Sequence, residues 1–343
     1  MSEPIVRFDP IVRFDKVNIV FGDRPKQALP LMDEGKTREE IKDATGQVLG
    51  VSDCTLDVDE GEILVLMGLS GSGKSTLLRA VNGLNPVIRG ECLVRCGDQT
   101  LNPETCSAAD LRFLRGQHVS MVFQQFALLP WRTVAENVGL GLELAGMNPA
   151  ERAEKVRDQL ELVGLGDWAD RKVGELSGGM QQRVGLARAF ATEAPILLMD
   201  EPFSALDPLI RTRLQDELLD FQKRLRRTII FVSHDLDEAV KLGRRIAIME
   251  GGRIIQIGTP QEIILHPADD YVADFVAHMN PMGVLRAAEV MEPGSAPEGA
   301  AQADPDTPLK QVMQMRLDTG KAVGVGNGNV VDDDAIIRAL LGR

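Results

Sequence analysis

The sequence predicts an α/β protein built around a buried parallel sheet. Three runs of consecutive apolar residues carry this prediction, because a strand that is covered on both faces is apolar at every position. They are Ile63–Met67, residues 196–199 in ILLMDEP, and residues 229–232 in TIIFVSHD. A glycine-rich loop follows the first run, an acidic pair the second and a histidine the third. We expect the acidic pair to lie beside the glycine-rich loop, at the carboxyl ends of the strands.

Composition limits what the chain can be. Its 343 residues, 44% of them hydrophobic, are enough for one large domain or two ordinary ones. With 51 acidic and 38 basic residues the net charge is −13, so we expect no nucleic-acid partner. No apolar run is long enough to cross a bilayer and the N-terminus is not typical of a signal peptide, so we expect a cytoplasmic chain unless a membrane partner holds it. The four cysteines have no C-x-x-C spacing, so we expect no metal site at their thiols. They are Cys54, Cys92, Cys96 and Cys106.

The N-terminal region carries a repeat and then an insert. IVRFDP is followed at once by IVRFDK; we expect a strand over residues 11–20 and assign no function to the other copy. Residues 23–50 are mostly polar and separate this strand from the segment that leads to the glycine-rich loop. Within them Thr37 and Glu40 have capping-box spacing, and Gly46 is placed to end a helix. The insert is therefore expected to contain a short ordered helix.

The glycine-rich loop is the most informative stretch. Residues 68–75 match G-x-x-x-x-G-K-[ST] and lie between an apolar strand and a segment with helical spacing. Main-chain N–H groups of such a loop close around phosphate oxygens, assisted by the helix N-terminus. We expect Lys74 to reach the β- and γ-phosphates of ATP, and the Ser75 hydroxyl to bind Mg²⁺. The predicted ATP-binding residues of the loop are Gly68, Ser70, Gly71, Ser72, Gly73, Lys74, Ser75 and Thr76.

The acidic pair ends the second apolar strand. A carboxylate at the carboxyl end of a parallel strand suits the coordination shell of a nucleotide-bound metal, so Asp200 is predicted to bind Mg²⁺. Glu201 points elsewhere, and is the expected general base or the group that orients the attacking water. The alternative is that the pair caps the next helix, an interpretation that fits poorly with Pro202.

A third motif indicates the family. ELSGGMQQRVGLARAF, with residues 176–183 at its centre, resembles the signature of ABC-type ATPases. Ser177, Gly178 and Gly179 are expected to open a helix at Met180, whose free N–H groups form a second anion site. The resemblance implies a head-to-tail homodimer in which this loop contacts the γ-phosphate bound to the other subunit.

Other landmarks of that family follow in order. Gln124 in VFQQ resembles the glutamine loop, which implies a catalytic and metal-binding role. Asp207 in SALD resembles the D-loop, expected to contact the ATP of the partner subunit. His234 resembles the switch histidine, although a lone histidine after a strand is more usually a capping or surface residue. Phe21 stands where the family has an aromatic that stacks on adenine; a buried strand phenylalanine is the alternative.

The resemblance also implies a domain organisation. It covers about residues 11–279, so residues 1–280 are expected to form an ABC ATPase domain with a RecA-like core, an antiparallel β-subdomain and a helical subdomain near residues 113–190. Residues 281–343 would be a short C-terminal extension. Its PMGVLRAAEVMEPG and GNVVDDDAIIRALLGR resemble the two ends of a CBS module, and residues 293–308 between them have the composition of a flexible linker. We therefore expect at most one degenerate CBS-like module.

The segment FALLPWRTVAENV favours an importer. Phe126, Leu129 and Trp131 lie close together in it, where importers of this family form the groove that accepts a coupling helix of the membrane subunit. The alternative is that these side chains belong to the core of the helical subdomain. The chain shows neither the fused membrane helices of many exporters, nor the long coiled coils of chromosome-maintenance relatives, nor a second cassette as in translation-associated relatives.

Three segments together resemble ABC importers for quaternary amines, most closely their choline-transporting members. They are the insert with its GKTREEI helix, the sequence MGLSGSGKSTLLRAVNGL and the tryptophan segment. This implies ATP hydrolysis that powers uptake of choline, or of glycine betaine or proline betaine. The homodimer would be peripheral, on the cytoplasmic side of the inner membrane, with integral permease subunits and an extracytoplasmic substrate-binding protein. An ATPase for another small-solute importer and a non-transport cytosolic ABC ATPase are the alternatives.

Overall fold

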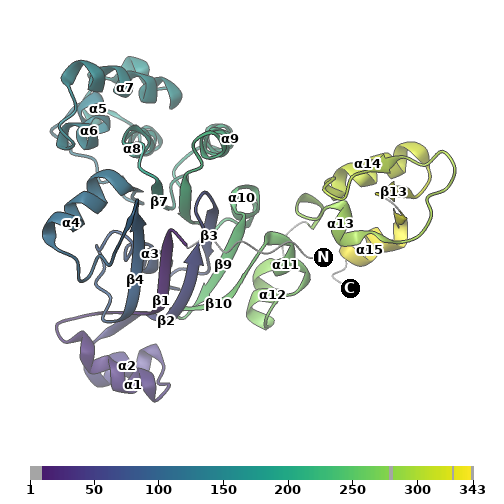
Figure 1. Ribbon diagram of the computed structural model, residues 1–343, viewed down its shortest axis with the longest axis horizontal. Helices are drawn as coiled ribbons and strands as arrows, with labels where there is room; N and C mark the ends of the chain where they lie inside the picture. The colour runs from purple at the N-terminus through teal and green to yellow at the C-terminus, as the bar shows by residue number, and fades with distance from the viewer. Residues whose placement is uncertain (1–9, 278–280, 327, 341–343) are drawn as a thin grey trace. The chain divides into compact units, whose positions relative to one another are not determined.

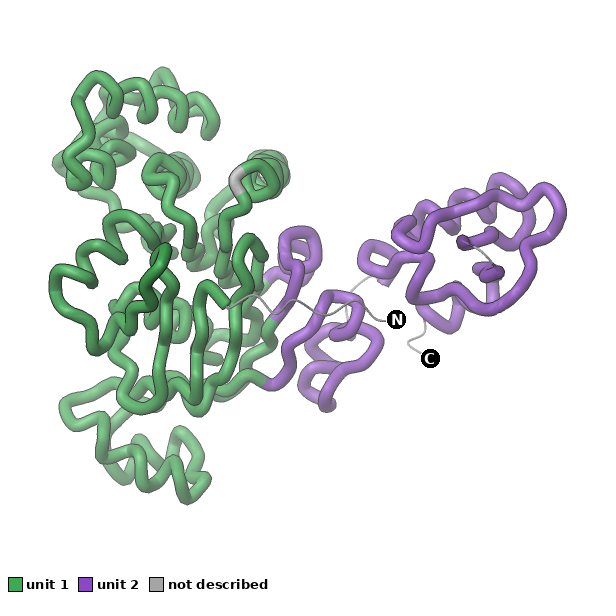
Figure 2. Tube along the Cα trace, viewed as in Figure 1, with its two compact units in different colours: residues 1–234, 247–254 green, residues 235–246, 255–343 purple. Residues whose placement is uncertain are grey.

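The computed structural model describes residues 10–277, 281–326 and 328–340. The first copy of the N-terminal repeat therefore lies almost entirely outside the described residues. The chain divides into two compact units, residues 1–234 with 247–254 and residues 235–246 with 255–343 (Figure 2).

A six-stranded sheet forms the centre of the fold (Figure 1). Its order is β10 (Arg253–Gly258), β9 (Arg245–Glu250), β3 (Ile63–Met67), β8 (Thr228–Val232), β7 (Ile196–Asp200) and β6 (Val119–Val122). The strands β3, β8, β7 and β6 run parallel, and every residue of β3, β7 and β8 is buried. The three predicted buried strands are therefore confirmed, in the order β3, β8 and β7. Leu66 and Asp200 both pair with Val232, so the carboxyl ends of these strands are level.

A second, antiparallel sheet contains β2 (Val48–Val58), β1 (Val12–Phe21), β4 (Arg89–Cys96) and β5 (Gln99–Leu101), in that order. The strand expected over residues 11–20 is β1. Phe14 and Ile19 of β1 share one buried core with Leu64 and Ile230 of the parallel sheet. Burial of these apolar side chains holds the two sheets together and fixes the start of β2 beside the loop that follows β3.

Short helices connect the sheets. Following the glycine-rich loop comes α3 (Lys74–Leu78); α4 (Ala108–Phe113) and η2 (Leu114–His118) precede β6. The extent of the helical subdomain, expected near residues 113–190, stays a prediction: this segment contains η2, the strand β6 and then the helices that follow that strand. They are α5 (Val134–Val138), α6 (Leu140–Leu144), α7 (Pro149–Leu162), η3 (Gly166–Trp168), η4 (Val173–Glu175) and α8 (Gly178–Ala191). The helix α9 (Pro208–Leu225) follows β7.

The insert between β1 and β2 is folded. It contains η1 (Pro25–Ala28), α1 (Leu29–Asp33) and α2 (Arg38–Thr45), drawn at the bottom of Figure 1. The predicted helix is confirmed as α2: Thr37 and Glu40 form both hydrogen bonds of the capping box, and Gly46 ends it in the left-handed conformation with φ +71°. Ala28 and Met32 are buried against the ends of β1 and β2. Because β2 begins at Val48, the last residues assigned to the insert belong to the sheet.

The second unit contains its own small sheet. Its first helices are α10 (Leu236–Leu242), α11 (Pro260–Leu265) and α12 (Asp270–Val276). Then follow η5 (Pro281–Gly283), α13 (Ala287–Val290), β11 (Glu292–Pro293), β12 (Gln302–Ala303), α14 (Leu309–Thr319), β13 (Val323–Val325), β14 (Asn329–Val331) and α15 (Asp333–Leu340). The strands are ordered β11-β14-β13-β12 around a buried core that includes Leu309, Val323 and Ile336.

The expectation of a flexible linker over residues 293–308 is wrong at Pro293, which pairs with Asn329 as part of β11, and in the second half of the segment. Gln302 and Ala303 pair in parallel with Gly324 and Val325, and the Ala303 side chain is buried. Main-chain hydrogen bonds to another strand do not depend on side-chain type, so the linker-like composition concealed this strand. The expected domain boundary at residue 280 stays a prediction. Among the described residues, no helix has the length and apolar character that a bilayer crossing requires.

Candidate functional site

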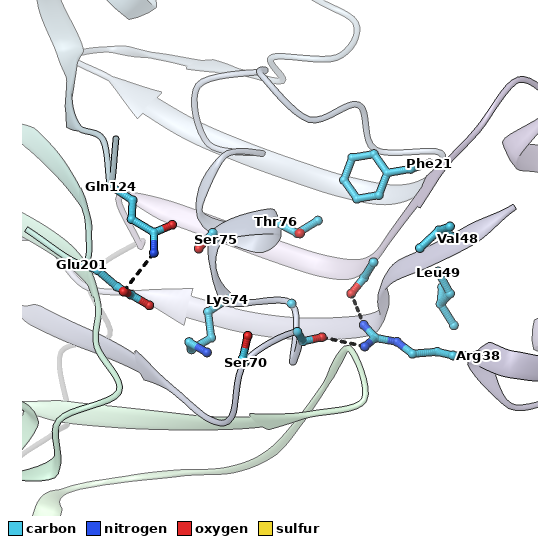
Figure 3. Close-up of a pocket in the computed structure, with 13 residues that line it drawn as sticks. Phe21, Arg38, Val48, Leu49, Ser70, Lys74, Ser75, Thr76, Gln124 and Glu201 are labelled. Carbon is cyan, nitrogen blue, oxygen red and sulfur yellow. Dashed lines mark hydrogen bonds between the residues drawn. The ribbon is translucent and has the colours of Figure 1, made fainter. Parts of the chain in front are cut away.

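A pocket lies beyond the carboxyl ends of β3 and β7 (Figure 3). It is lined by Phe21, Arg38, Val48, Leu49, Gly50, Ser70, Gly71, Gly73, Lys74, Ser75, Thr76, Gln124 and Glu201. Apart from Arg38 and three residues of β2, all of these were predicted from the sequence. The fold thus brings together residues that lie far apart in the chain, from Phe21 at the end of β1 to Glu201 directly after β7.

The loop of residues 68–73 wraps closely because two of its glycines allow it. Gly68 has φ +139°, and a Cβ there would lie 2.1 Å from the carbonyl oxygen of Met249. Gly73 has φ +103°, and a Cβ there would lie 2.7 Å from the carbonyl oxygen of Gly50. Both positions combine a left-handed backbone with close approach of main chain, which excludes other side chains.

Lys74 is buried and lies over the loop. Its Nζ donates to the carbonyl oxygens of Gly68 at 2.7 Å and Leu69 at 2.9 Å, and to Ser72 Oγ at 3.3 Å. Burial lowers the pKa of Lys74, and the negative charges of Glu201 and Asp200 oppose this shift. The ammonium group is therefore held at the centre of the loop, where an anion would compensate its desolvation.

Asp200 is a fully buried carboxylate with two partners. Its Oδ1 accepts a hydrogen bond from Ser75 Oγ at 2.6 Å, and its Oδ2 accepts one from Arg79 Nη2 at 2.8 Å. The predicted Mg²⁺ residues Ser75 and Asp200 thus touch. Arg79 was missed by the sequence analysis; its spacing of four from Ser75, which puts both on one face of a helical segment, was the available signal.

Glu201 has an unusual main chain. Its φ is +47°, which for a residue with a Cβ is strained by roughly 1–2 kcal/mol. The N–H donates to the carbonyl oxygen of Val232 at 3.1 Å, and the carbonyl accepts from Ser204 Oγ at 3.1 Å and from Gln182 Nε2 at 3.3 Å. These bonds hold the strained conformation, and the Glu201 side chain lines the pocket (Figure 3).

Two predicted residues converge on the Glu201 carboxylate. Gln124 Nε2 donates to its Oε2 at 3.0 Å, and His234 Nδ1 lies 3.6 Å from its Oε1. The His234 side chain is 66% exposed, so it contacts the carboxylate from the solvent side. The alternative that the acidic pair caps the next helix is not what the structure has: Asp207 is the N-cap of α9, accepting from Ile210 N at 3.0 Å.

The signature loop lies outside this pocket. Ser177 is the N-cap of α8, which begins at Gly178 rather than at Met180 because the serine hydroxyl already accepts a hydrogen bond from Met180 N, at 3.4 Å. Ser177, Gly178 and Asp207 are exposed and Gly179 is half-buried. In the part of the chain that the structure describes, none of these residues lines the pocket.

The segment after Gln124 bends sharply. Phe126 and Ala127 both have positive φ, +55° and +47°, and their carbonyl oxygens accept hydrogen bonds from the Arg188 guanidinium of α8 at 2.8 and 2.7 Å. Phe126 and Leu129 are half-buried, whereas Trp131 is 69% exposed. The core interpretation therefore does not apply to Trp131.

Phe21 and Arg38 complete the pocket at the end that faces the insert. The Phe21 side chain is 39% exposed at the end of β1, so it is not the buried strand phenylalanine of the alternative interpretation. Arg38, the first residue of α2, donates to the carbonyl oxygens of Gly71 at 2.7 Å and Gly50 at 2.5 Å. Sequence analysis predicted the helix but not this contact, because nothing local to GKTREEI indicates which residues its N-terminus meets.

The chain is similar to known proteins over most of its length. A family model described as ABC transporter matches residues 51–204. The glycine betaine/proline betaine transport system ATP-binding protein ProV of Escherichia coli K12 is 46% identical over 305 residues, which cover 89% of this chain and 75% of ProV. The chain belongs to the ABC transporter ATP-binding family. It is an ABC-type ATPase and binds ATP, as the sequence motifs predicted.

Further comparisons agree with this family. The glycine betaine transport ATP-binding protein OpuAA of Bacillus subtilis is 48% identical over 281 residues, 82% of this ABC ATPase and 66% of OpuAA. A solved dimeric structure of the ATP-binding cassette MJ0796, in a post-hydrolysis state with ADP and Pi bound, matches with a TM-score of 0.63 at 28% identity. That match covers 73% of this chain and 98% of MJ0796, and it confirms the predicted fold.

Proposed function

We propose that this ABC ATPase is the ATP-hydrolysing subunit of an importer for a quaternary amine. The observation that carries the proposal is the 46% identity to ProV over 89% of the chain. The printed names of the relatives specify glycine betaine, proline betaine and, for TmoW of Ruegeria pomeroyi, trimethylamine N-oxide. Choline, expected from the sequence, carries the same trimethylammonium group as glycine betaine.

Hydrolysis is assigned to the groups that meet in the pocket. The loop amides and Lys74 bind the β- and γ-phosphates. Glu201 accepts a proton from water while the water oxygen bonds to the γ-phosphorus; the bond from that phosphorus to the β–γ bridging oxygen breaks, leaving ADP and phosphate. Gln124 and His234, in contact with the Glu201 carboxylate, keep it aimed at the water.

The residues at the phosphate end fit Mg²⁺. Ser75 Oγ and Asp200 Oδ1 are oxygen donors 2.6 Å apart beside the loop, and oxygen is the ligand that Mg²⁺ prefers. Ser75 and Asp200 would hold the ion together with the side-chain carbonyl of Gln124. Bound with the nucleotide, Mg²⁺ neutralises phosphate charge.

Two copies of the chain would complete each site. Ser177, Gly178, Gly179 and Asp207 are accessible but lie outside the pocket of their own chain. In a head-to-tail homodimer they would contact the γ-phosphate bound to the other subunit, with the N-terminus of α8 supplying N–H groups. The dimeric MJ0796 structure supports this arrangement.

The remaining partners follow from an importer role. We assign the exposed Trp131, with Phe126 and Leu129, to the contact with integral permease subunits on the cytoplasmic side of the inner membrane. An extracytoplasmic protein would select the substrate, since cation recognition uses cages of aromatic rings and this chain is only 4% aromatic. Residues 281–343 would be an extension beyond the ATPase domain, related to a single CBS module.

Solute uptake tests the proposal. Labelled glycine betaine, choline and proline betaine are supplied at low concentration to a strain that lacks this gene. Restoring the wild-type chain should restore uptake of at least one of them, and restoring Lys74→Ala should not. The control is Lys42→Ala, which removes an exposed lysine of the insert. Normal uptake of all three solutes without the gene, with loss of another solute's import, would contradict the substrate and leave the importer. A chain that purifies without any permease subunit would favour a non-transport ATPase.

A further inference from the structure

The insert delivers one cation to the wall of the nucleotide pocket. Arg38 lies at the start of α2, on the opposite side of the loop from Lys74 in the view of Figure 3. Its Nη1 donates to the carbonyl oxygen of Gly71, inside the phosphate loop, and its Nη2 to that of Gly50, in β2. A single planar guanidinium therefore joins the loop to the sheet that carries Phe21.

The position of Arg38 is set by the fold of the insert. The capping box of Thr37 and Glu40 fixes where α2 begins, and Arg38 is the first residue after that cap. Ile41, one turn later, is fully buried with Val20 of β1. A cap at one end and a buried side chain in the middle leave α2 little freedom to rotate, so the guanidinium is delivered to one place.

The second acceptor, Gly50, lines this end of the pocket. A Cβ on Gly50 would lie 2.8 Å from Phe21 Cε2 and 3.0 Å from Thr76 Cγ2. Gly50 thus touches the ring predicted to stack on adenine and the residue that follows Ser75. By binding Gly50 and Gly71 at once, Arg38 fixes the spacing between the base end and the phosphate end of the pocket.

Among the described residues, no carboxylate forms a salt bridge with Arg38, and no acidic group contributes to its pKa shift. Its buried Nε has no hydrogen-bond partner. Burial lowers the pKa of Arg38, which means that its charged form is partly desolvated. An anion bound in the adjacent loop would offset that desolvation, and the phosphates of a nucleotide are such an anion.

We propose that Arg38 is a positioning residue through which the insert sets the nucleotide affinity of this ATPase. It holds the phosphate loop and the Gly50 region at the spacing that a bound nucleotide needs, and adds positive charge beside the phosphates. The insert is then part of the nucleotide site rather than only an added contact surface. This inference rests on the proposed nucleotide site.

The test measures binding and turnover separately on the purified full chain. Affinity is followed with a fluorescent ATP analogue, and KM and kcat are followed by phosphate release. Because the loop is then less well preorganised, Arg38→Ala should raise the Kd and KM about tenfold, or about 1.4 kcal/mol of binding free energy, and change kcat at saturating ATP by less than about twofold. Arg38→Lys keeps the charge but cannot bind both carbonyls, so its Kd should lie between those of the wild type and Arg38→Ala.

Matched variants separate this role from a general one. Lys42→Ala removes an exposed cation from the same helix and should leave the Kd unchanged. Hydrogen exchange of residues 68–73 should accelerate in Arg38→Ala and not in Lys42→Ala. An equal rise of the Kd in both variants, or a loss of kcat at unchanged Kd, would overturn the proposal.

The reference variant is Lys74→Ala. If it loses nucleotide binding while Arg38→Ala and Arg38→Lys bind like wild type, the inference about Arg38 is wrong and the nucleotide site stands. If Lys74→Ala itself binds like wild type, the proposed nucleotide site is wrong. Thermal unfolding identifies any variant that fails to fold; the conservative Arg38→Lys then decides, with a Kd equal to that of wild type as the contradicting result.

Discussion

The two ends of the nucleotide pocket hold their groups in different ways. At the phosphate end, Lys74 binds main-chain carbonyls of its own loop, but the two carboxylates are bound by side chains: Ser75 and Arg79 bind Asp200, and Gln124 binds Glu201. At the insert end, Arg38 binds main-chain carbonyls. A side-chain network fails when one residue type changes, whereas a bond to the main chain depends on the folding of the segment that carries the donor. Changes at the phosphate end should therefore alter turnover or stability strongly, and changes at the insert end should alter affinity moderately.

The largest effect is expected for Glu201→Gln. The amide cannot accept the proton of the attacking water, so kcat should fall by about 10²–10⁴-fold. ATP binding should persist because Lys74, Ser75 and Asp200 are unchanged. Phosphate release by the partner-activated complex gives kcat, and Glu39→Gln, on an exposed residue of α2, is the control. Near-normal hydrolysis in Glu201→Gln would remove Glu201 from the chemistry.

Arg79→Met should destabilise the phosphate end. Breaking a buried ion pair costs about 3–5 kcal/mol, but the Arg79 side chain is 36% exposed, so we expect a loss of about 1–3 kcal/mol in the free energy of unfolding. Urea denaturation measures it. In an Asp200→Asn background the same change should cost much less. The control is Arg13→Met, since Arg13 and Asp57 are both about half exposed. Equal costs with and without Asp200 would show that the pair does not stabilise the fold.

Phe21→Ala tests the base end. Loss of a stacking ring should raise the Kd for ATP roughly two- to tenfold, with kcat at saturation retained. Phe21→Trp keeps an aromatic face and should bind nearly as wild type. Fluorescent-analogue titration distinguishes these variants. An unchanged Kd in Phe21→Ala would place the adenine elsewhere.

The smallest effect is expected for Thr37→Ala. Loss of an N-cap costs about 1 kcal/mol of helix stability, which should loosen α2 and raise the Kd for ATP by about twofold through Arg38. Ser107→Ala is the matched control, because Ser107 caps α4 by the same kind of bond and does not line the pocket. Hydrogen exchange of residues 38–45 reports the loosening. If the Kd for ATP rose equally in both variants, the insert would have no specific effect on nucleotide affinity.

These differences also explain what the sequence could predict. The helix α2 was predictable because the residues that begin and end it, Thr37, Glu40 and Gly46, lie within or directly beside it in the sequence. Ser75, Asp200 and Glu201 were predictable because phosphate chemistry demands those residue types after apolar strands. Arg38 was not, since its partners are carbonyl oxygens that every residue possesses. The strand β12 was concealed for the same reason.

Local sequence patterns also failed to predict the start of α8 and the main-chain conformation of Glu201. A serine, two glycines and a methionine suggested a helix start at Met180, but the hydrogen bond from Met180 N to Ser177 places the start at Gly178. The strained φ of Glu201 depends on Gln182 and Val232, which are remote in the chain or on another strand, so no local pattern could indicate it.

In the proposed dimer, one chain binds ATP and the signature loop of a second copy completes the site. The most direct measurement is the mass of Glu201→Gln in solution by light scattering, with and without ATP. We expect ATP to shift it from one chain of 37.4 kDa to two. Adding Ser177→Arg, which puts a bulky cation where the partner's γ-phosphate would lie, should keep the protein monomeric while its Kd for ATP stays that of Glu201→Gln. A dimer that persists in the double variant, or a collapse of its ATP affinity as a monomer, would show that Ser177 does not face the γ-phosphate bound to the other copy.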